Sequence, residues 1–78
     1  MEPDWTDVSQ RFMALTLKEI RPIARGWFMG CLGGASRKDE TVREMVSQMR
    51  HWWHLPDAIG RGRVRNVLVE LERAERDA

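Results

Sequence analysis

The residues with the clearest chemical potential lie between positions 50 and 65, where cationic and aromatic side chains alternate. One arginine, two histidines and two tryptophans precede three arginines at every second position: Arg50, His51, Trp52, Trp53, His54, Arg61, Arg63 and Arg65. Asp57 is the only acid in this segment. Guanidinium groups bind phosphates or carboxylates, and indoles stack on bases or anchor protein interfaces. The pattern therefore predicts binding to a polyanion or to an acidic protein surface.

A second cationic group begins the longest expected helix. Ser36 suits an N-cap, because Asp39 and Glu40 follow in the first turn. The N-terminus of such a helix offers free N–H groups to a phosphate. We predict that phosphates contact both groups, with an indole adding stacking: Ser36, Arg37, Lys38, Arg43, Arg50, Arg61, Arg63 and Arg65, with Trp52 or Trp53. Adjacent helical residues point about 100° apart, so one of these tryptophans is expected to be partly exposed.

Metal binding and catalysis are the other chemistries that the sequence offers. His51, His54 and Cys31 together could hold a metal ion, but zinc needs three or four ligands at defined spacings, and the chain has no CxxC or HExxH pattern. We predict that both imidazoles lie at a helix C-terminus, where positive charge is favourable, and that the cysteine is packed rather than nucleophilic. No catalytic set of acids or Ser-His-Asp arrangement stands out. The expectation is a non-enzymatic protein without metal or cofactor.

Composition limits the size of the fold and its compartment. The chain of 78 residues is expected to form a single domain, 1–78, and its 13 Lys and Arg against 12 Asp and Glu give a net charge of +1. Electrostatic binding must therefore depend on how the charges are distributed. One cysteine and no long apolar run predict a soluble, cytoplasmic protein without a membrane segment. A homodimer is possible, because a core of this size supplies only about 3–5 kcal/mol.

Apolar residues recur at three- to four-residue spacing throughout the chain, which predicts helices over residues 5–15, 17–32, 37–53 and 63–76. Thr16 and Glu19 form a capping-box pattern at the start of the second segment. Pro22 lies inside that segment and predicts either a kink or a restart of the helix. Gly60 and Gly62 predict a flexible connector before the last helix. The expected fold class is all-α, a bundle of three to four helices.

Two segments resemble the SAP domain and the related N-terminal module of transcription terminator Rho. They are LTLKEIRPIAR at residues 15–25 and GASRKDETVREMV at residues 34–46. The resemblance implies a helix, extended loop, helix unit that contacts the DNA or RNA backbone through Gly34, Ser36, Arg37 and Lys38. The chain departs from the family pattern by about three extra apolar residues between positions 27 and 32.

The end of the chain is similar to the C-terminal helix of small phage anti-CRISPR proteins. The similar residues are Leu55-Pro56 and the pattern GxGRVxNxLxELxR at 60–73. This likeness implies an alternative function, inhibition of a nucleic-acid-handling complex through protein contacts. The first hypothesis is binding to the DNA backbone through a basic face, and RNA is not distinguished from DNA.

Overall fold

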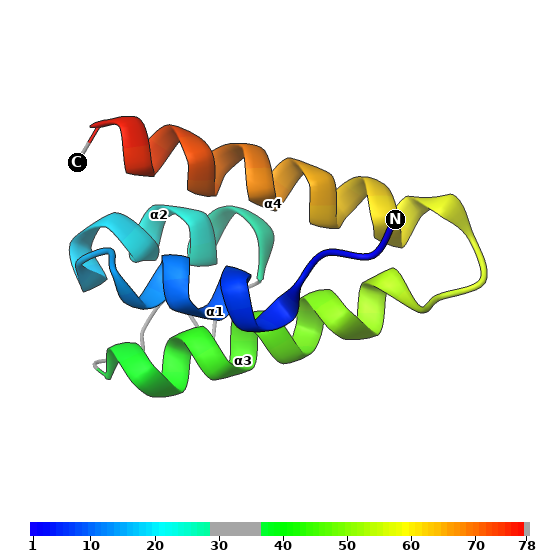
Figure 1. The fold of residues 1–78 in the computed structure, drawn as a ribbon, viewed down its shortest axis with the longest axis horizontal. Coiled ribbons are helices and arrows are strands. Elements are labelled where there is room, and N and C mark those ends of the chain that lie inside the picture. The colour runs from blue at the N-terminus through cyan, green and yellow to red at the C-terminus, as the bar shows by residue number, and fades with distance from the viewer. Residues whose placement is uncertain (29–36, 78) are drawn as a thin grey trace.

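The computed structural model describes residues 1–28 and 37–77, and within these residues the chain forms four α-helices and no strand (Figure 1). The helices are α1 (Trp5–Met13), α2 (Leu17–Trp27), α3 (Lys38–Trp53) and α4 (Ala58–Asp77). They pack as a small helical bundle, so the predicted all-α class is confirmed. None of the described helices is both long and apolar enough to cross a lipid bilayer.

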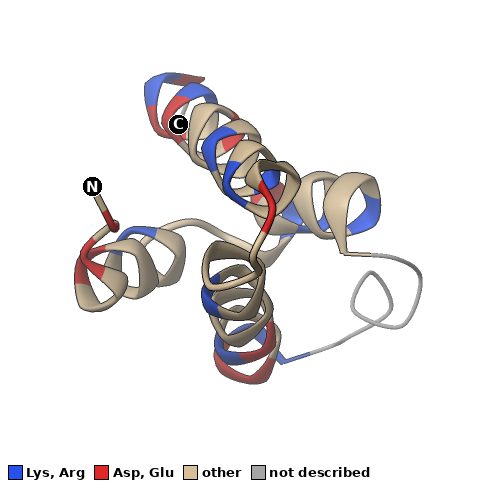
Figure 2. Ribbon diagram, turned by 90° about the vertical axis from the view of Figure 1, so that its right-hand side faces the viewer, with Lys and Arg blue, Asp and Glu red and all other residues tan. Residues whose placement is uncertain are grey.

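The two longest helices form an antiparallel pair that supports the other two. Residues 54–57 connect α3 to α4, which runs back along it (Figure 1). Helix α1 packs mainly against α3, and α2 packs mainly against α4. Seen end-on, α1 and α2 lie on opposite sides of the α3–α4 pair (Figure 2). The pair therefore has two different flanks, and side chains at the connected ends of α3 and α4 can face either one.

The core is built from the apolar side of each helix. Its fully enclosed side chains come from all four helices: Phe12, Ile20, Val42, Met45, Met49, Val64, Val67 and Leu71. Gly60 is also buried, and a Cβ there would lie 2.8 Å from the carbonyl carbon of Trp52. Glycine thus allows the first turn of α4 to touch the backbone of α3.

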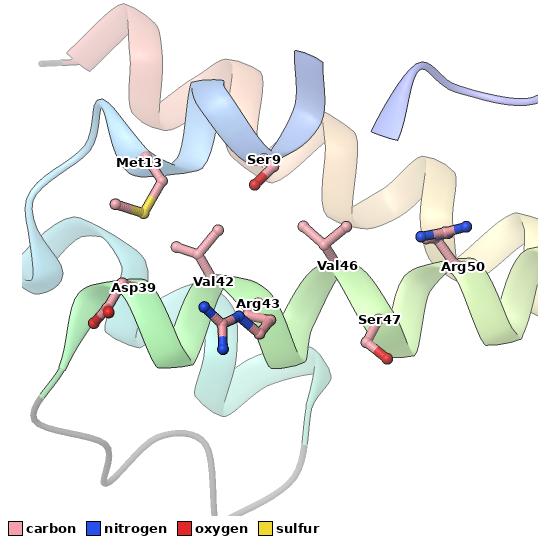
Figure 3. Close-up of a pocket in the computed structure, with 8 residues that line it drawn as sticks. All are labelled: Ser9, Met13, Asp39, Val42, Arg43, Val46, Ser47 and Arg50. Carbon is pink, nitrogen blue, oxygen red and sulfur yellow. The ribbon is translucent and has the colours of Figure 1, made fainter. Parts of the chain in front are cut away.

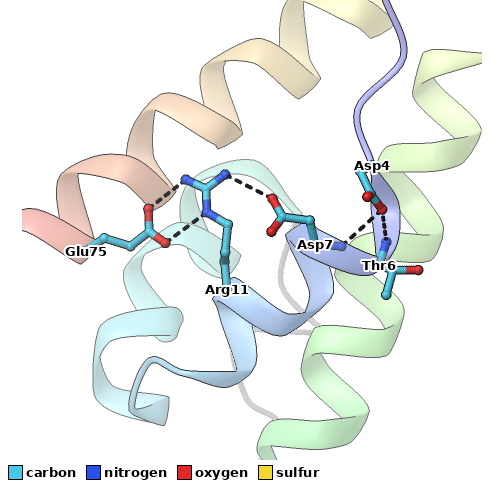
Figure 4. Close-up of polar contacts among 5 residues, drawn as sticks. All are labelled: Asp4, Thr6, Asp7, Arg11 and Glu75. Carbon is cyan, nitrogen blue, oxygen red and sulfur yellow. Dashed lines mark hydrogen bonds and ion pairs between the residues drawn. The ribbon is translucent and has the colours of Figure 1, made fainter.

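Local polar contacts begin the first two helices. The Asp4 carboxylate accepts the backbone N–H groups of Thr6 and Asp7 at 3.1 and 3.2 Å (Figure 4). The predicted capping box is confirmed, because the Thr16 hydroxyl accepts the Glu19 N–H and the Glu19 carboxylate accepts the Thr16 N–H. Of the two outcomes considered for Pro22, the restart does not occur, since α2 continues through it.

One ion pair joins elements that are far apart in the sequence. Arg11 in α1 donates to Glu75 in α4 through Nε at 2.9 Å and Nη2 at 2.6 Å, and its Nη1 lies 3.8 Å from Asp7 (Figure 4). Both side chains of the bidentate pair are about one third exposed. The Arg11 hydrogen bond holds the pKa of Glu75 below its ordinary value. This pair ties α1 to the last turns of α4.

Several predicted helix boundaries are wrong. The first helix ends at Met13 rather than at residue 15, and the last begins at Ala58 rather than at residue 63. The proposed connector containing Gly60 and Gly62 is therefore helical, and the Asp57 carboxylate accepts the Ile59 N–H at 3.1 Å beside its first turn.

The start of α3 and the end of α2 also differ from expectation. The N-cap of α3 is Arg37, in extended geometry and without a side-chain cap hydrogen bond. Helix α2 ends at Trp27, followed by Phe28. The predicted N-cap Ser36, residues 29–32 of the expected second helix, Cys31 and the SAP-like loop lie outside the described residues, so the resemblance stays a prediction.

Candidate nucleic-acid interface

Trp52 and Trp53 are the last two residues of α3, and they face different flanks of the bundle. Trp52 is only 7% exposed, and its ring stacks on Phe28 with centroids 5.0 Å apart. Trp53 is half-buried, which confirms that one of the pair is partly exposed. Trp52 was the other candidate for stacking, and its burial in the core leaves that role to Trp53.

The three arginines at the start of α4 divide between these two indoles. The Arg61 and Arg65 guanidinium carbons each lie 6.0 Å from the centre of the Trp53 ring, and that of Arg63 lies 5.3 Å from the Trp52 ring. Residues two apart on a helix point to nearly opposite sides, whereas residues four apart share a side. Arg61 and Arg65 therefore face one flank and Arg63 faces the other, so the predicted group of three does not form one surface.

A groove between α1 and α3 carries two more of the predicted cations. Its volume is about 440 Å³, and it is lined by Ser9, Met13, Asp39, Val42, Arg43, Val46, Ser47 and Arg50 (Figure 3). The buried valines form an apolar floor. Arg43 and Arg50 lie two turns apart along α3, and neither forms an ion pair with another described residue.

Arg50 connects this groove to the Trp53 ring. It lies one turn before Trp53 on α3, so the two side chains are neighbours on the helix surface. Four cations from two helices thus border one half-buried indole and the adjoining groove. We call this set the Trp53 surface, and it consists of Arg43, Arg50, Trp53, Arg61 and Arg65. In the part of the chain that the structure describes, none of its arginines is paired with a carboxylate.

Two carboxylates border this surface: Asp39 lines the groove, and Glu2 lies near Arg50. Glu2 accepts the Trp5 indole N–H at 2.7 Å and lies 3.0 Å from Nε2 of His54. Its pKa is lowered, mainly by the hydrogen bond from Trp5 and also by His54 and the charge of Arg50. The acid is therefore ionised at neutral pH and moderates the positive potential near Arg50.

The cations at the start of α3 are engaged in local contacts. Arg37 lies 3.5 Å from Asp39 and 3.5 Å from Glu40. Lys38 donates to the carbonyls of Met13 and Leu15 at 2.9 and 3.2 Å, where it satisfies the C-terminal end of α1. The rise of α3 places them about 22 Å from Trp53 along the helix axis. The predicted residues therefore do not form one continuous cationic face.

The two histidines occupy the predicted place at the end of α3. His51 lies in the last turn and His54 is the C-cap, with its ring against Glu2. Among the residues described, no three His, Cys, Asp or Glu side chains are grouped as a metal site would require.

A third group of cations, on α2, was not predicted. Lys18 and Arg25 are exposed on the side of α2 away from the buried Ile20, and the partly buried Arg21 lies at the edge of that side. The same spacing that identified the buried residues would have identified this group.

Comparison with protein-family models, curated proteins and solved structures finds no match to this chain.

Proposed function

We propose that the protein binds DNA through the Trp53 surface, by contacts to phosphates rather than to base edges. The observation that carries the proposal is the position of Arg61 and Arg65 against the Trp53 ring, with Arg50 one turn away on α3. Cations from two helices are thereby held around one point. Phosphate contacts of this kind carry no sequence information, so little sequence preference is expected.

Contact with the Trp53 indole restricts the Arg61 and Arg65 side chains before a phosphate binds. A cation–π interaction at an exposed site stabilises the pair by about 0.5–1 kcal/mol and restricts the long side chain. The guanidinium N–H groups remain available as donors, because no described carboxylate is paired with them. Less conformational entropy is then lost when a phosphate binds. Trp53 acts in this proposal mainly by positioning Arg61 and Arg65.

The modest net charge of the protein limits the affinity for DNA that we expect. With a net charge of +1, the protein has no strong overall positive field, and binding depends on the local surface. Four phosphate contacts to duplex DNA predict a slope of about −3.6 for the logarithm of the binding constant against the logarithm of salt concentration. Non-specific complexes of this type have dissociation constants of about 10⁻⁴ to 10⁻⁶ M at physiological salt.

Fluorescence anisotropy with a labelled DNA duplex, measured at several salt concentrations, tests the proposal. The variant R50Q/R61Q/R65Q removes three of the four contacts of the Trp53 surface, so the slope for binding at this surface is expected to fall to about −0.9. The control is R73Q/R76Q, which removes charge from arginines that are paired with acids and lie outside the Trp53 surface. Its slope is expected to stay near the wild-type value. Equal losses in both variants, or wild-type binding no tighter than millimolar at low salt, would refute the proposal.

A second candidate function is binding to an acidic protein surface. Ile59 is 70% exposed and lies one turn before Arg63 on α4, so an apolar anchor adjoins a cation. An exposed isoleucine contributes nothing to phosphate binding, whereas it can pack against the apolar part of a protein interface. After nuclease treatment, recovery of a stoichiometric protein partner that the I59D variant fails to recover would favour this function. Recovery that is equal with wild type and variant would count against it.

A further inference from the structure

The outer side of α2 carries cations whose charge is not compensated locally. Lys18, Arg21 and Arg25 form no ion pair with any residue that the structure describes. The one acid in α2 is Glu19, and its carboxylate is held by Thr16 in the capping box. The backbone and side-chain hydrogen bonds from Thr16 lower the pKa of Glu19, so it serves the helix start as an anion. Positive charge therefore remains on the outer side of α2, where Lys18 and Arg25 are exposed and Arg21 is partly buried.

Arg63 lies on the side of α4 that faces the end of α2. Phe28 directly follows α2 and lies one turn beyond Arg25. Its ring stacks on Trp52, and the Arg63 guanidinium lies 5.3 Å from that same ring. Arg63 therefore lies on the same flank of the α3–α4 pair as the C-terminal end of α2. We call this set the Trp52 surface, and it consists of Lys18, Arg21, Arg25 and Arg63.

The two cationic surfaces lie on different flanks of the molecule. Trp52 and Trp53 point about 100° apart, and each holds arginines of α4 on its own side. Helices α1 and α2, which border the two surfaces, lie on opposite sides of the α3–α4 pair along the shortest axis of the molecule (Figure 2). The extent along that axis is 19 Å, about twice the Debye length of about 10 Å at 0.1 M salt. A phosphate chain on one flank is therefore largely screened from a chain on the other.

We propose that the Trp52 surface binds a second segment of nucleic acid, so that a single protein molecule bridges two duplexes. This inference rests on the proposed function, because it takes the Trp53 surface as the first binding site. It adds a distinct physical consequence, which is that the protein joins DNA segments rather than only coating them. Both surfaces contact backbone phosphates, so bridging is expected to be insensitive to sequence and to weaken as salt increases.

Capture of one duplex by another tests this inference. A biotinylated duplex is fixed on beads, and recovery of a fluorescent duplex is measured after protein is added. Wild type is expected to recover the fluorescent duplex and to saturate at two duplexes per protein. The variant K18Q/R21Q/R25Q is expected to saturate at one duplex per protein and to lose at least tenfold in recovery. The control R73Q/R76Q removes two charges from arginines that lie outside both surfaces and is expected to behave as wild type.

The outcomes separate the two proposals. If wild type binds one duplex per protein and recovers none, bridging is wrong, and the Trp53 site stands if R50Q/R61Q/R65Q loses that binding. Recovery that persists in the α2 variant also overturns the inference, because bridging would then arise from another surface or from self-association. If wild type binds no DNA, both proposals fail. The substituted side chains lie outside the core, and far-UV circular dichroism checks that each variant remains helical.

Discussion

Replacement of Gly60 by alanine tests how α4 is seated on α3. A Cβ at this position would lie 2.8 Å from the carbonyl carbon and 3.2 Å from the Cα of Trp52, and closer still to the carbonyl oxygen. These atoms belong to the backbone, so no side-chain rotation relieves the overlap. The first turn of α4 must therefore move away from the end of α3, and the packing of Trp52 against Phe28 moves with it.

The expected cost follows from two opposing effects. Overpacking of a closely packed site costs about 1–3 kcal/mol, and a contact with rigid backbone belongs at the upper end of that range. Alanine regains about 1 kcal/mol of helix propensity relative to glycine. The net loss is about 2 kcal/mol of unfolding free energy, from a total of about 3–5 kcal/mol for a domain of this size. The melting temperature is expected to fall by about 8–16 °C.

Urea unfolding followed by far-UV circular dichroism measures this loss. Gly62 provides the matched control, because it lies in the same helix and a Cβ there meets no heavy atom within 4 Å. Gly62→Ala is expected to increase the unfolding free energy by about 0.5–1 kcal/mol. An unfolding free energy that falls in Gly60→Ala and rises in Gly62→Ala would support the close approach of α3 and α4. A Gly60→Ala variant as stable as wild type would refute the reasoning.

Three further substitutions test contacts described above. Glu75→Gln removes the bidentate partner of Arg11 and is expected to cost about 0.5–1 kcal/mol at pH 7 by urea unfolding. The pKa of Glu75 is below its ordinary 4.5 in the folded protein. The difference in unfolding free energy between wild type and variant should therefore be complete above pH 4.5 and vanish as the pH falls through the folded-state pKa. A difference that persists at pH 2 would contradict this account. Thr16→Ala removes the capping box and is expected to lower the unfolding free energy by about 1 kcal/mol, whereas no change would show that the cap is dispensable. Trp53→Leu retains every charge but removes the cation–π contacts, so DNA affinity by anisotropy should fall about two- to fivefold while the salt slope stays constant, and a changed slope would argue against a positioning role.

The helices were predictable where local signals agreed with the packing. Apolar spacing identified the buried sides that contain Val8, Phe12 and Ile20, and Thr16 with Glu19 marked the start of α2 correctly. In each case one short stretch of sequence contains both the hydrogen-bonding groups and the apolar pattern. Such segments form the same structure whichever helix they pack against.

The start of α4 was not predictable in the same way. Glycine has low helix propensity, so Gly60 and Gly62 pointed to a loop. The reason for glycine at position 60 lies in the backbone of α3, and that contact exists only after the two helices have packed. Once this turn is helical, the arginines at alternate positions separate to two flanks. The error in the helix boundary thus also produced the error in the candidate surface.

Ion pairing was the other property hidden from the sequence. Arg37 and Arg43 look equivalent as basic residues, yet the first is paired with two acids and the second with none among the residues described. Arg11 finds its partner 64 positions away in Glu75. Charge counts cannot distinguish these cases, because the partners depend on which helical sides meet.

The short connection at residues 54–57 has a consequence for how the molecule assembles. Closing a loop this small costs little chain entropy, so α3 and α4 can meet early in folding. The Arg11–Glu75 bond joins positions 64 apart and must wait until α1 has docked. We expect native-state hydrogen exchange to find the slowest amides in the middle of the hairpin that α3 and α4 form. That hairpin contains Trp52 and Trp53, so the folding nucleus and the division between the two flanks would arise in the same step.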